Sequence, residues 1–211
     1  MSSKPLIIIG GGGHASVLVA MLIRQRRDIL AVISPDDISG RACLATLPHL
    51  RDDEDIMQFA PEDVELINAI GATPGSLLRR KVNERFLNKG YSFASVISDE
   101  AIVSDFAVIH TGAQILTRAI IQPGAVIGSH SVVNTGAIIE HDCHIGAYNF
   151  IAPGATLCGD VRTRDNVFIG AGATIIPGMQ LDDNAFVAAG AVLVNSLGAG
   201  KRCYSVKTVI K

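Results

Sequence analysis

A short stretch at residues 138–146, IIEHDCHIG, concentrates the side chains best suited to acid–base or metal chemistry. It holds His141, Asp142, Cys143 and His144. A histidine beside a carboxylate can act as a general base, because the carboxylate holds the ring in one tautomer and stabilises its protonated form. Histidine and cysteine are also zinc ligands, but a zinc site needs three or four ligands that converge. The direction of each side chain decides between these two chemistries.

A six-residue repeat surrounds this stretch and sets those directions. From Ala101 to residue 196 the chain divides into sixteen consecutive hexads without an insertion. The third place is Ile, Val or Leu in every hexad except at Thr163. The first place is mostly Ala, with small substitutes at Ser131, Cys143 and Asn149. Such a repeat predicts a parallel β-helix of a little over five coils, in which three hexads form one triangular coil.

Alternation along the strands then orients the reactive residues. If the third-place isoleucines point inward, Glu140 and His144 point outward and Cys143 points into the core. A free cysteine is a common buried residue, so we exclude it from any metal site. His141 and Asp142 lie at the corner between two faces, where a histidine base can reach a substrate. The repeat therefore favours the catalytic interpretation.

A zinc site is the alternative for the same histidines. The γ-class carbonic anhydrases, which are β-helical trimers, bind zinc through three histidines from adjacent subunits, and two of these are separated by four residues. Here two residues separate His141 from His144, and no other pair among His110, His130, His141 and His144 has the wider spacing. We therefore predict a site without a metal.

Residues 4–97 show a different pattern, an alternation of strand and helix. The predicted strands are LIIIG, ILAVIS, VELINAIG and YSFASVI, and the predicted helices begin near His14 and within PGSLLRRKVNERFLNKG. The short connections predict a small parallel sheet with helical cover. The glycines of GGGGHA, between the first strand and helix, let the backbone approach a phosphate. Gly10, Gly12 and Ala15 fit a dinucleotide pattern, but the unit has about half the strands of a dinucleotide-binding fold, which argues against NAD.

The composition narrows the classes of function. A formal net charge of −2 and the lack of a basic stripe argue against nucleic acid as a partner. The start of the sequence lacks the long apolar region of a signal peptide, and no later segment could span a bilayer, so we expect no membrane association. The four cysteines show no CxxC spacing, which predicts reduced thiols and a cytoplasmic protein.

Over nearly all of its 211 residues the chain resembles the PglD/NeuD-type sugar acetyltransferases. The motifs that carry the resemblance are IIIGGGGHA, ISPDD, AIGATPGSLLR, VVNTGAIIEHDCHIG and the run of hexads. The resemblance implies an α/β N-terminal domain (a small Rossmann-like βαβ unit) at residues 1–98 that binds a nucleotide sugar. It implies a left-handed parallel β-helix of hexapeptide repeats, the acetyltransferase domain, at residues 99–211, with a short C-terminal tail. It also implies a homotrimer with active sites between subunits.

The same resemblance implies a reaction and a set of site residues. The implied reaction transfers an acetyl group from acetyl-CoA to the 4-amino group of a nucleotide-linked 4-amino-4,6-dideoxysugar, in glycan precursor biosynthesis and without a metal. In this family the histidine of an E-H-[DE] motif is the general base and the next carboxylate raises its basicity, roles that fall on His141 and Asp142. The implied nucleotide-sugar contacts are Gly12, Gly13, His14, Asp36, Asp37 and Gly71. The implied acetyl-CoA contacts are Gly159, Ala171 and Ala189, with Phe150 where some members carry a second histidine, and Lys201, Arg202 and Lys207 near the CoA phosphates.

Three alternatives stay open at this point. Asp36 and Asp37 also fit a simple turn after a strand, and the basic residues near the end also fit a solvated tail. Some members of the family are O-acetyltransferases that act on a sugar acid such as sialic acid, and others act on perosamine. A β-helix that binds a nucleotide without catalysing a reaction is the third alternative.

Overall fold

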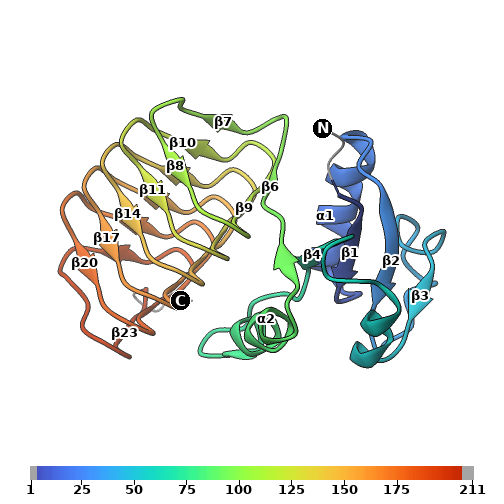
Figure 1. The fold of residues 1–211 in the computed structure, drawn as a ribbon. Coiled ribbons are helices and arrows are strands. Elements are labelled where there is room, and N and C mark those ends of the chain that lie inside the picture. The colour runs from blue at the N-terminus through green and yellow to red at the C-terminus, as the bar shows by residue number, and fades with distance from the viewer. Residues whose placement is uncertain (1–3, 206–211) are drawn as a thin grey trace, which may run out of the picture. The chain divides into compact units, whose positions relative to one another are not determined.

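The computed structural model describes residues 4–205, and the chain divides into two compact units, Met1–Val96 and Ile97–Lys211 (Figure 1). Each unit has a hydrophobic core of its own. None of the helices within the described residues combines the length and the apolar character needed to cross a membrane.

The first unit is built on a parallel sheet, as predicted, and the sheet has five strands. Its strand order is β3-β2-β1-β4-β5, and β1, which is buried over its whole length, lies at the centre. A fully buried parallel strand reads as a continuous apolar run, which is why LIII stands there. In chain order the elements are β1 (Leu6–Ile9), α1 (Gly13–Arg24), β2 (Ile29–Ile33), β3 (His49–Leu50), η1 (Asp53–Gln58), β4 (Glu65–Asn68), α2 (Leu78–Asn88) and β5 (Ser92–Phe93).

The structure differs from the predicted elements of this unit at three points. The residues YSFASVI do not form one strand, because β5 ends at Phe93 and the next paired residues, β6 (Val96–Ile97), hydrogen-bond to β9 (Gln114–Ile115) instead. Helix α2 begins only after Gly75, whose positive φ of 76° is incompatible with a helix. The structure also adds β3 and the short 3₁₀ helix η1, which the predicted elements omit.

The second unit is a parallel β-helix in which a two-residue strand recurs every six residues (Figure 1). Strands eighteen residues apart lie side by side, as Ile120 does with Ile138, and this register gives three hexads per coil, as predicted. The three sheets have the orders β22-β19-β16-β13-β10-β7, β20-β17-β14-β11-β8 and β23-β21-β18-β15-β12-β9-β6. After β6 and β9 are counted, the remaining strands are β7 (Ile102–Val103), β8 (Val108–Ile109), β10 (Ile120–Ile121), β11 (Val126–Ile127), β12 (Val132–Val133), β13 (Ile138–Ile139), β14 (His144–Ile145), β15 (Phe150–Ile151), β16 (Thr156–Leu157), β17 (Arg162–Thr163), β18 (Phe168–Ile169), β19 (Thr174–Ile175), β20 (Gln180–Leu181), β21 (Phe186–Val187), β22 (Val192–Leu193) and β23 (Arg202–Cys203).

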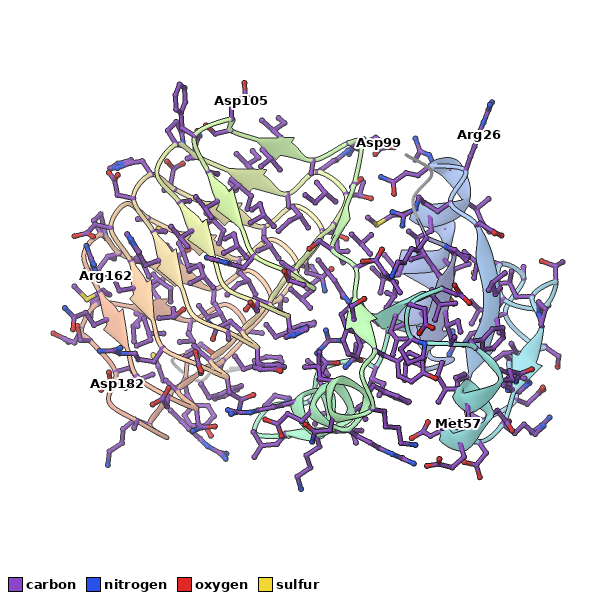
Figure 2. All side chains as sticks on the ribbon, viewed as in Figure 1. Arg26, Met57, Asp99, Asp105, Arg162 and Asp182 are labelled. Atoms are coloured by element: carbon purple, nitrogen blue, oxygen red, sulfur yellow. The ribbon has the colours of Figure 1, made fainter. Side chains whose placement is uncertain are left out.

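The corners of the β-helix have a regular backbone conformation. Every sixth residue from Gly112 to Gly190 has a positive φ, so the sixth place of these hexads turns in the left-handed region. Glycine, asparagine and aspartate adopt this region most readily, and they fill most of these places. Side chains near the corners and at the outer strand positions project outward, as Asp105, Arg162 and Asp182 do in Figure 2. The corner is therefore where the coil can present polar groups.

The departures from the hexad pattern at Ser131, Asn149 and Thr163 belong to one buried hydrogen-bond network. Nδ2 of Asn149 donates to Oγ1 of Thr163 and to the carbonyl of Arg164, both at 2.9 Å. The hydroxyl of Ser131 donates to the carbonyl of Gly146 at 2.7 Å and accepts from the amide of Asn149 at 2.9 Å. Because buried polar groups need partners, these three residues interrupt the apolar pattern together.

One outer face of the β-helix carries a column of aromatic rings. Phe150, Phe168, Phe186 and Tyr204 follow one another with ring centroids 5.3, 5.8 and 5.8 Å apart. Rings at these separations pack against each other and cover apolar surface between successive coils. Phe150 is therefore the first ring of a column that stabilises this face.

Candidate functional site

The histidine and the carboxylate of the central motif form a dyad at one corner of the β-helix. His141 and Asp142 lie between β13 and β14, and Nδ1 of His141 is 2.8 Å from Oδ2 of Asp142. Because an ionised carboxylate can only accept, Nδ1 carries the proton that it donates, and Nε2 keeps a free lone pair. Both side chains are exposed, at 64% and 67% of their surface, so the dyad can meet a substrate.

Two neighbours lie against Asp142. Asp142 has a φ of 60°, the corner conformation that aspartate tolerates. One coil away, a Cβ on Gly124 would lie 2.5 Å from Oδ1 of Asp142, so the absence of a side chain there leaves space for the carboxylate. Nδ1 of His144 donates to the backbone carbonyl of Asp142 at 2.9 Å. His144 thus points outward, as predicted, and contacts the dyad through the main chain.

The opposite neighbour of the dyad is Gly159, eighteen residues after His141. A Cβ on Gly159 would lie 2.6 Å from Nε2 and from Cε1 of His141, so the imidazole ring lies directly over this glycine. The amide of Asp160 donates to the carbonyl of His141 at 3.0 Å and ties the two corners together. Among residues 4–205 the N–H of Gly159 has no acceptor. A free imidazole nitrogen and a free amide donor therefore lie close together.

The carboxylate changes the acidity of the histidine. The hydrogen bond to Asp142 raises the pKa of His141 above its ordinary value of 6.5, and the negative charges of Asp142, Glu140 and Asp160 act in the same direction. A higher pKa makes the neutral imidazole a stronger proton acceptor. The arrangement is suited to general-base catalysis near neutral pH.

Cys143 lies in the core, as predicted. It is fully buried, and its thiol donates to the carbonyl of Cys158 at 3.1 Å. Burial raises the pKa of this thiol to about 11, opposed by a hydrogen bond from the amide of Val161. The thiol is therefore protonated and inert as a nucleophile. Within the described part of the chain, no group of three or more His, Cys, Asp or Glu side chains is placed to hold a metal ion.

The predicted acetyl-CoA contacts do not come together within one chain. Gly159 lies against His141. Ala171 and Ala189 lie on successive coils at a different corner of the β-helix, the one between the sheets of β18 and β19. Phe150 lies on the outer face of β15 in the aromatic column. Lys201 and Arg202 are exposed near the end, and Lys207 lies outside the described residues. These positions cannot surround one ligand on a single chain.

The first unit contains a cleft of about 540 Å³ at the carboxyl ends of β1, β2 and β4. In the sheet, β2 lies on one side of β1 and β4 lies on the other. The strand order therefore reverses at β1, and such a reversal leaves a crevice that commonly binds ligands. Of the predicted substrate contacts, Gly12, Asp36 and Gly71 line this cleft. Gly13, His14 and Asp37 do not line it; the carboxylate of Asp37 accepts from the hydroxyl of Ser39 at 2.6 Å instead.

The four consecutive glycines have two different roles. A Cβ on Gly11 would lie 2.5 Å from Ile38, and Gly10 has a φ of 108° beside the end of β4, so these two glycines allow close packing. Gly12 and Gly13 have no atom within 4 Å of a Cβ position. Gly12 also ends the loop before α1 without a side-chain cap. The helix N-terminus is therefore open to an anionic group.

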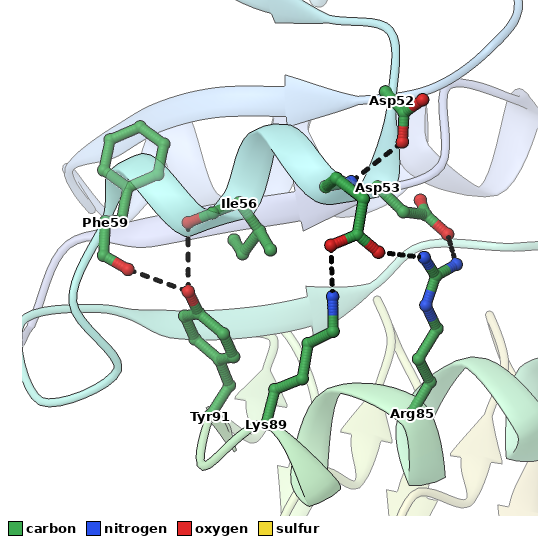
Figure 3. A network of polar contacts seen from close by, with 8 residues as sticks. Asp52, Asp53, Ile56, Phe59, Arg85, Lys89 and Tyr91 are labelled. Atoms are coloured by element: carbon green, nitrogen blue, oxygen red, sulfur yellow. Dashed lines mark hydrogen bonds and ion pairs between the residues drawn. The ribbon is translucent and has the colours of Figure 1, made fainter.

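The cleft also has residues that the sequence analysis missed. Arg51 and Arg85 line it, together with apolar side chains of the loop after β4 and of α2. Arg85 forms ion pairs with Asp53 and Glu54, each at 2.6 Å, and Figure 3 shows Arg85 beside Asp53. These pairs join α2 to η1 and fix one wall of the cleft. Because Arg51 follows a strand that was not predicted, and Arg85 lies within a charged helix, no local spacing identifies either residue.

A buried polar network fixes the opposite loop of the cleft. The guanidinium of Arg79 donates to the carbonyl of Asn68, the last residue of β4, and to that of Ile70 in the loop that follows. Burial of this group lowers the pKa of Arg79 to about 10, which leaves it charged at neutral pH. Nδ2 of Asn68 donates to Oδ1 of Asn83 at 2.6 Å. The loop that carries Gly71 is thus held against α2.

The two units match known families separately. Residues 5–86 match the PglD N-terminal domain. Residues 124–159 match the bacterial transferase hexapeptide family (six repeats), and residues 165–194 match the hexapeptide repeat of succinyl-transferase. No curated protein matches the sequence.

Solved structures resemble the chain over its whole length. PerB from Caulobacter crescentus, in complex with CoA and GDP-perosamine, is 29% identical with a TM-score of 0.86, over 98% of this chain and 97% of that chain. In both of its units the chain is similar to the PglD-type sugar acetyltransferases. The acetyltransferase domain of PglB from Neisseria gonorrhoeae, in complex with acetyl coenzyme A, shares the fold at 24% identity and a TM-score of 0.86, over 98% and 100% of the two chains. WeeI from Acinetobacter baumannii shares it at 24% identity and a TM-score of 0.75, over 94% and 96%.

Within one chain, the groups suited to acid–base chemistry therefore lie together at the corner of His141, Asp142 and Gly159. The cleft of the first unit offers open glycines, three carboxylates and two arginines, a set that suits a phosphorylated, hydroxyl-bearing ligand. The two sites differ in kind: one presents a basic imidazole at an exposed corner, and the other is a cleft lined by polar groups.

Proposed function

We propose that the protein transfers the acetyl group of acetyl-CoA to the 4-amino group of a nucleotide-linked 4-amino-4,6-dideoxysugar. The observation that carries the proposal is the His141–Asp142 dyad, with Nε2 free and directly above Gly159. The likeness to PerB, solved with CoA and GDP-perosamine, supports a nucleotide-linked amino sugar as the acceptor. A glycan precursor is the corresponding product.

The reaction needs a general base for the amine and a hydrogen-bond donor for the thioester oxygen. The amine nitrogen attacks the carbonyl carbon of the thioester while Nε2 of His141 takes a proton from the amine. Asp142 stabilises the resulting imidazolium, which then gives a proton to the departing CoA sulfur as the carbon–sulfur bond breaks. The products are the N-acetyl sugar and CoA, and His141 returns to its neutral form.

The N–H of Gly159 is our proposed donor to the oxygen of the thioester. During attack this oxygen becomes negatively charged, and a fixed amide donor beside it lowers the barrier. Gly159 has such an N–H without an acceptor among residues 4–205, next to the base. This role fits the position of Phe150, because a phenyl ring cannot supply the hydrogen bond of a second histidine.

The cleft of the first unit is our proposed nucleotide site. The amides at Gly12 and at the start of α1 would bind the phosphates, and Asp36 at the end of β2 would accept hydrogen bonds from the ribose hydroxyls. Gly13, His14 and Asp37, which do not line the cleft, would then contact the nucleotide only at the edge of the cleft. Gly71 would leave space for the ligand at the opposite side.

The assembly that we propose is a homotrimer. Ala171, Ala189 and Phe150 lie away from His141 on one chain, so they would contact acetyl-CoA at the dyad of a neighbouring copy. We also propose a cytoplasmic location, in line with four cysteines that are all free.

The test is a transfer assay with acetyl-CoA and a panel of GDP-, UDP- and dTDP-linked 4-amino-6-deoxysugars, followed by mass spectrometry of the sugar. We expect acetylation of one nucleotide sugar and a loss of about 10²–10⁴-fold in rate in His141→Ala. The matched control is His110→Ala, an exposed histidine of an earlier hexad. A loss under about threefold in His141→Ala would discard the base assignment. Acetylation of a free sugar acid instead would favour an O-acetyltransferase. Binding of a nucleotide sugar without acetyl transfer would favour a β-helix that binds a nucleotide without catalysis.

A further inference from the structure

Three polar or sulfur-containing residues at the first place of a hexad share an unexpected geometry. In most corners the first-place amide donates directly to the carbonyl three residues earlier, as Ala125 does to Gln122 at 3.2 Å and Ala173 to Gly170 at 3.1 Å. In the turn of residues 146–149, the hydroxyl of Ser131 bonds both groups instead. It donates to the carbonyl of Gly146 and accepts from the amide of Asn149. The side chain of one coil thus bridges the turn of the next.

Asn149 repeats this arrangement one coil further along. Its Nδ2 donates to the carbonyl of Arg164, and its Oδ1 accepts from the amide of Val167. In these two turns no direct bond joins the carbonyl and the amide among the described residues. In both turns the side chain of the preceding coil joins the carbonyl to the amide.

Cys143 occupies the equivalent place above the turn of residues 158–161. Its thiol donates to the carbonyl of Cys158 at 3.1 Å, and the amide of Val161 lies near enough to its sulfur to oppose the rise in the pKa of the thiol. No direct bond between Val161 and Cys158 is present in this part of the structure. The turn that Cys143 bridges is the one that carries Gly159 beneath the ring of His141.

The planarity of the peptide links the buried thiol to the exposed amide. The structure has no cis peptide bond among its described residues, so the C=O of Cys158 and the N–H of Gly159 point in opposite directions. The thiol in the core holds that carbonyl inward. The N–H of Gly159 must then point outward, on the side where Nε2 of His141 lies.

We infer that Cys143 is a positioning residue for the reaction: its thiol orients the Cys158–Gly159 peptide so that the N–H of Gly159 faces the thioester oxygen. This inference rests on the proposed function, because it assigns the amide a role in acetyl transfer. It explains why a cysteine stands at a place that alanine fills in most hexads. Cys143 itself does not touch the substrate.

The variants follow from the bridging geometry. Cys143→Ala places the common first-place residue there and removes the bridge, so the amide of Val161 can pair directly with the carbonyl of Cys158 and turn the peptide. Cys143→Ser keeps a bridging donor, as the native Ser131 does in its own turn. Ser131→Ala is the matched control, because it removes the same kind of bridge from a turn that carries no part of the dyad.

We expect Cys143→Ala to lower kcat by about tenfold, less than the roughly 10²–10³-fold that loss of an oxyanion donor costs, because the amide is misdirected rather than removed. The KM for acetyl-CoA should change by less than about twofold, since ground-state binding does not depend on this bond. Cys143→Ser should restore most of kcat, and Ser131→Ala should leave it unchanged. Equal kcat in Cys143→Ala and Ser131→Ala would overturn the inference.

A crystal structure of Cys143→Ala separates this inference from the proposed function. We expect the turn of residues 158–161 to close, with the N–H of Gly159 rotated away from His141. An unchanged Gly159 peptide would overturn the inference whatever the activity. If the wild-type protein transfers no acetyl group to any nucleotide sugar, the proposed function fails, while a rotated peptide in the variant would still support the positioning by Cys143.

Discussion

In the β-helix, the neighbours of a side chain lie eighteen residues away along the chain, whereas in the α/β unit they come from loops with no constant spacing. His141 lies over Gly159 because their hexads stack, and Asp142 has Gly124 on its other side for the same reason. The cleft of the first unit gathers Gly12, Asp36 and Arg85 from three different elements. A substitution in the β-helix should therefore act along a column, and one in the cleft should act only at its own contact.

The largest expected effect tests the column. Gly159→Ala should lower kcat by about 10²–10³-fold, because a Cβ 2.6 Å from Nε2 of His141 must displace the base and disturb the amide donor. The matched control is Gly198→Ala, where the nearest atom to a new Cβ is Cγ of Lys201 at 3.9 Å. Steady-state kinetics of the two variants decide the question. Equal activity would show that the stacked glycine is unimportant.

The second effect tests the dyad within a single hexad. Because Asp142 raises the pKa of His141, the rate of the wild-type enzyme should rise with pH through an inflection above 6.5, as the imidazolium loses its proton. Asp142→Asn removes the charge, so the inflection should move to lower pH while the plateau rate falls by about tenfold or more. A pH profile of kcat/KM for both proteins measures the shift. An unchanged inflection would show that Asp142 does not raise the pKa of the general base.

The third effect tests the cleft, where adjacent residues should differ. Asp36→Asn should raise the KM for the nucleotide sugar by about tenfold, the cost of one charge-assisted hydrogen bond to the ribose, with little change in the KM for acetyl-CoA. Asp37→Asn is the control, since its carboxylate accepts from Ser39 outside the cleft. Equal effects at both positions would mean that the nucleotide contacts the rim as much as the cleft.

The smallest effect tests the interior of the β-helix. Thr163→Val restores the aliphatic residue that every other hexad carries at this place, yet it should lower the free energy of unfolding by about 1 kcal/mol. The reason is that Nδ2 of Asn149 and the amide of Gly146 both lose Oγ1 of Thr163 as an acceptor. Denaturant unfolding measures the difference. A more stable variant would show that the apolar pattern outweighs the network.

The repeat made the β-helix and the corner position of His141 and Asp142 predictable, because one register fixes every strand. The same register marked Ser131, Asn149 and Thr163 as exceptions without indicating that they are partners, since the contact depends on side-chain length and rotamer. The boundary near Phe93 was less predictable, because YSFASVI has β-forming residues throughout and only pairing partners decide where the strand breaks.

The cleft was predicted only in part. The glycines and Asp36 follow strands, where sequence signals are strong, and the cleft contains Gly12, Gly71 and Asp36. Arg51 and Arg85 depend on the pairing of β3 and on the ion pairs between α2 and η1. These are tertiary contacts between elements far apart in the sequence, and no local pattern encodes them.

The eighteen-residue pairing of the strands also restricts how the β-helix can change in length. One residue inserted between Cys143 and Cys158 would bring Cys158, instead of Gly159, beneath the ring of His141, and would turn the apolar residues that follow toward solvent. Eighteen residues inserted beyond Gly178 would add a whole coil and leave every neighbour of the dyad in place. The β-helix can therefore grow on that side only in whole coils, and such growth leaves the corner of His141 and Asp142 unchanged.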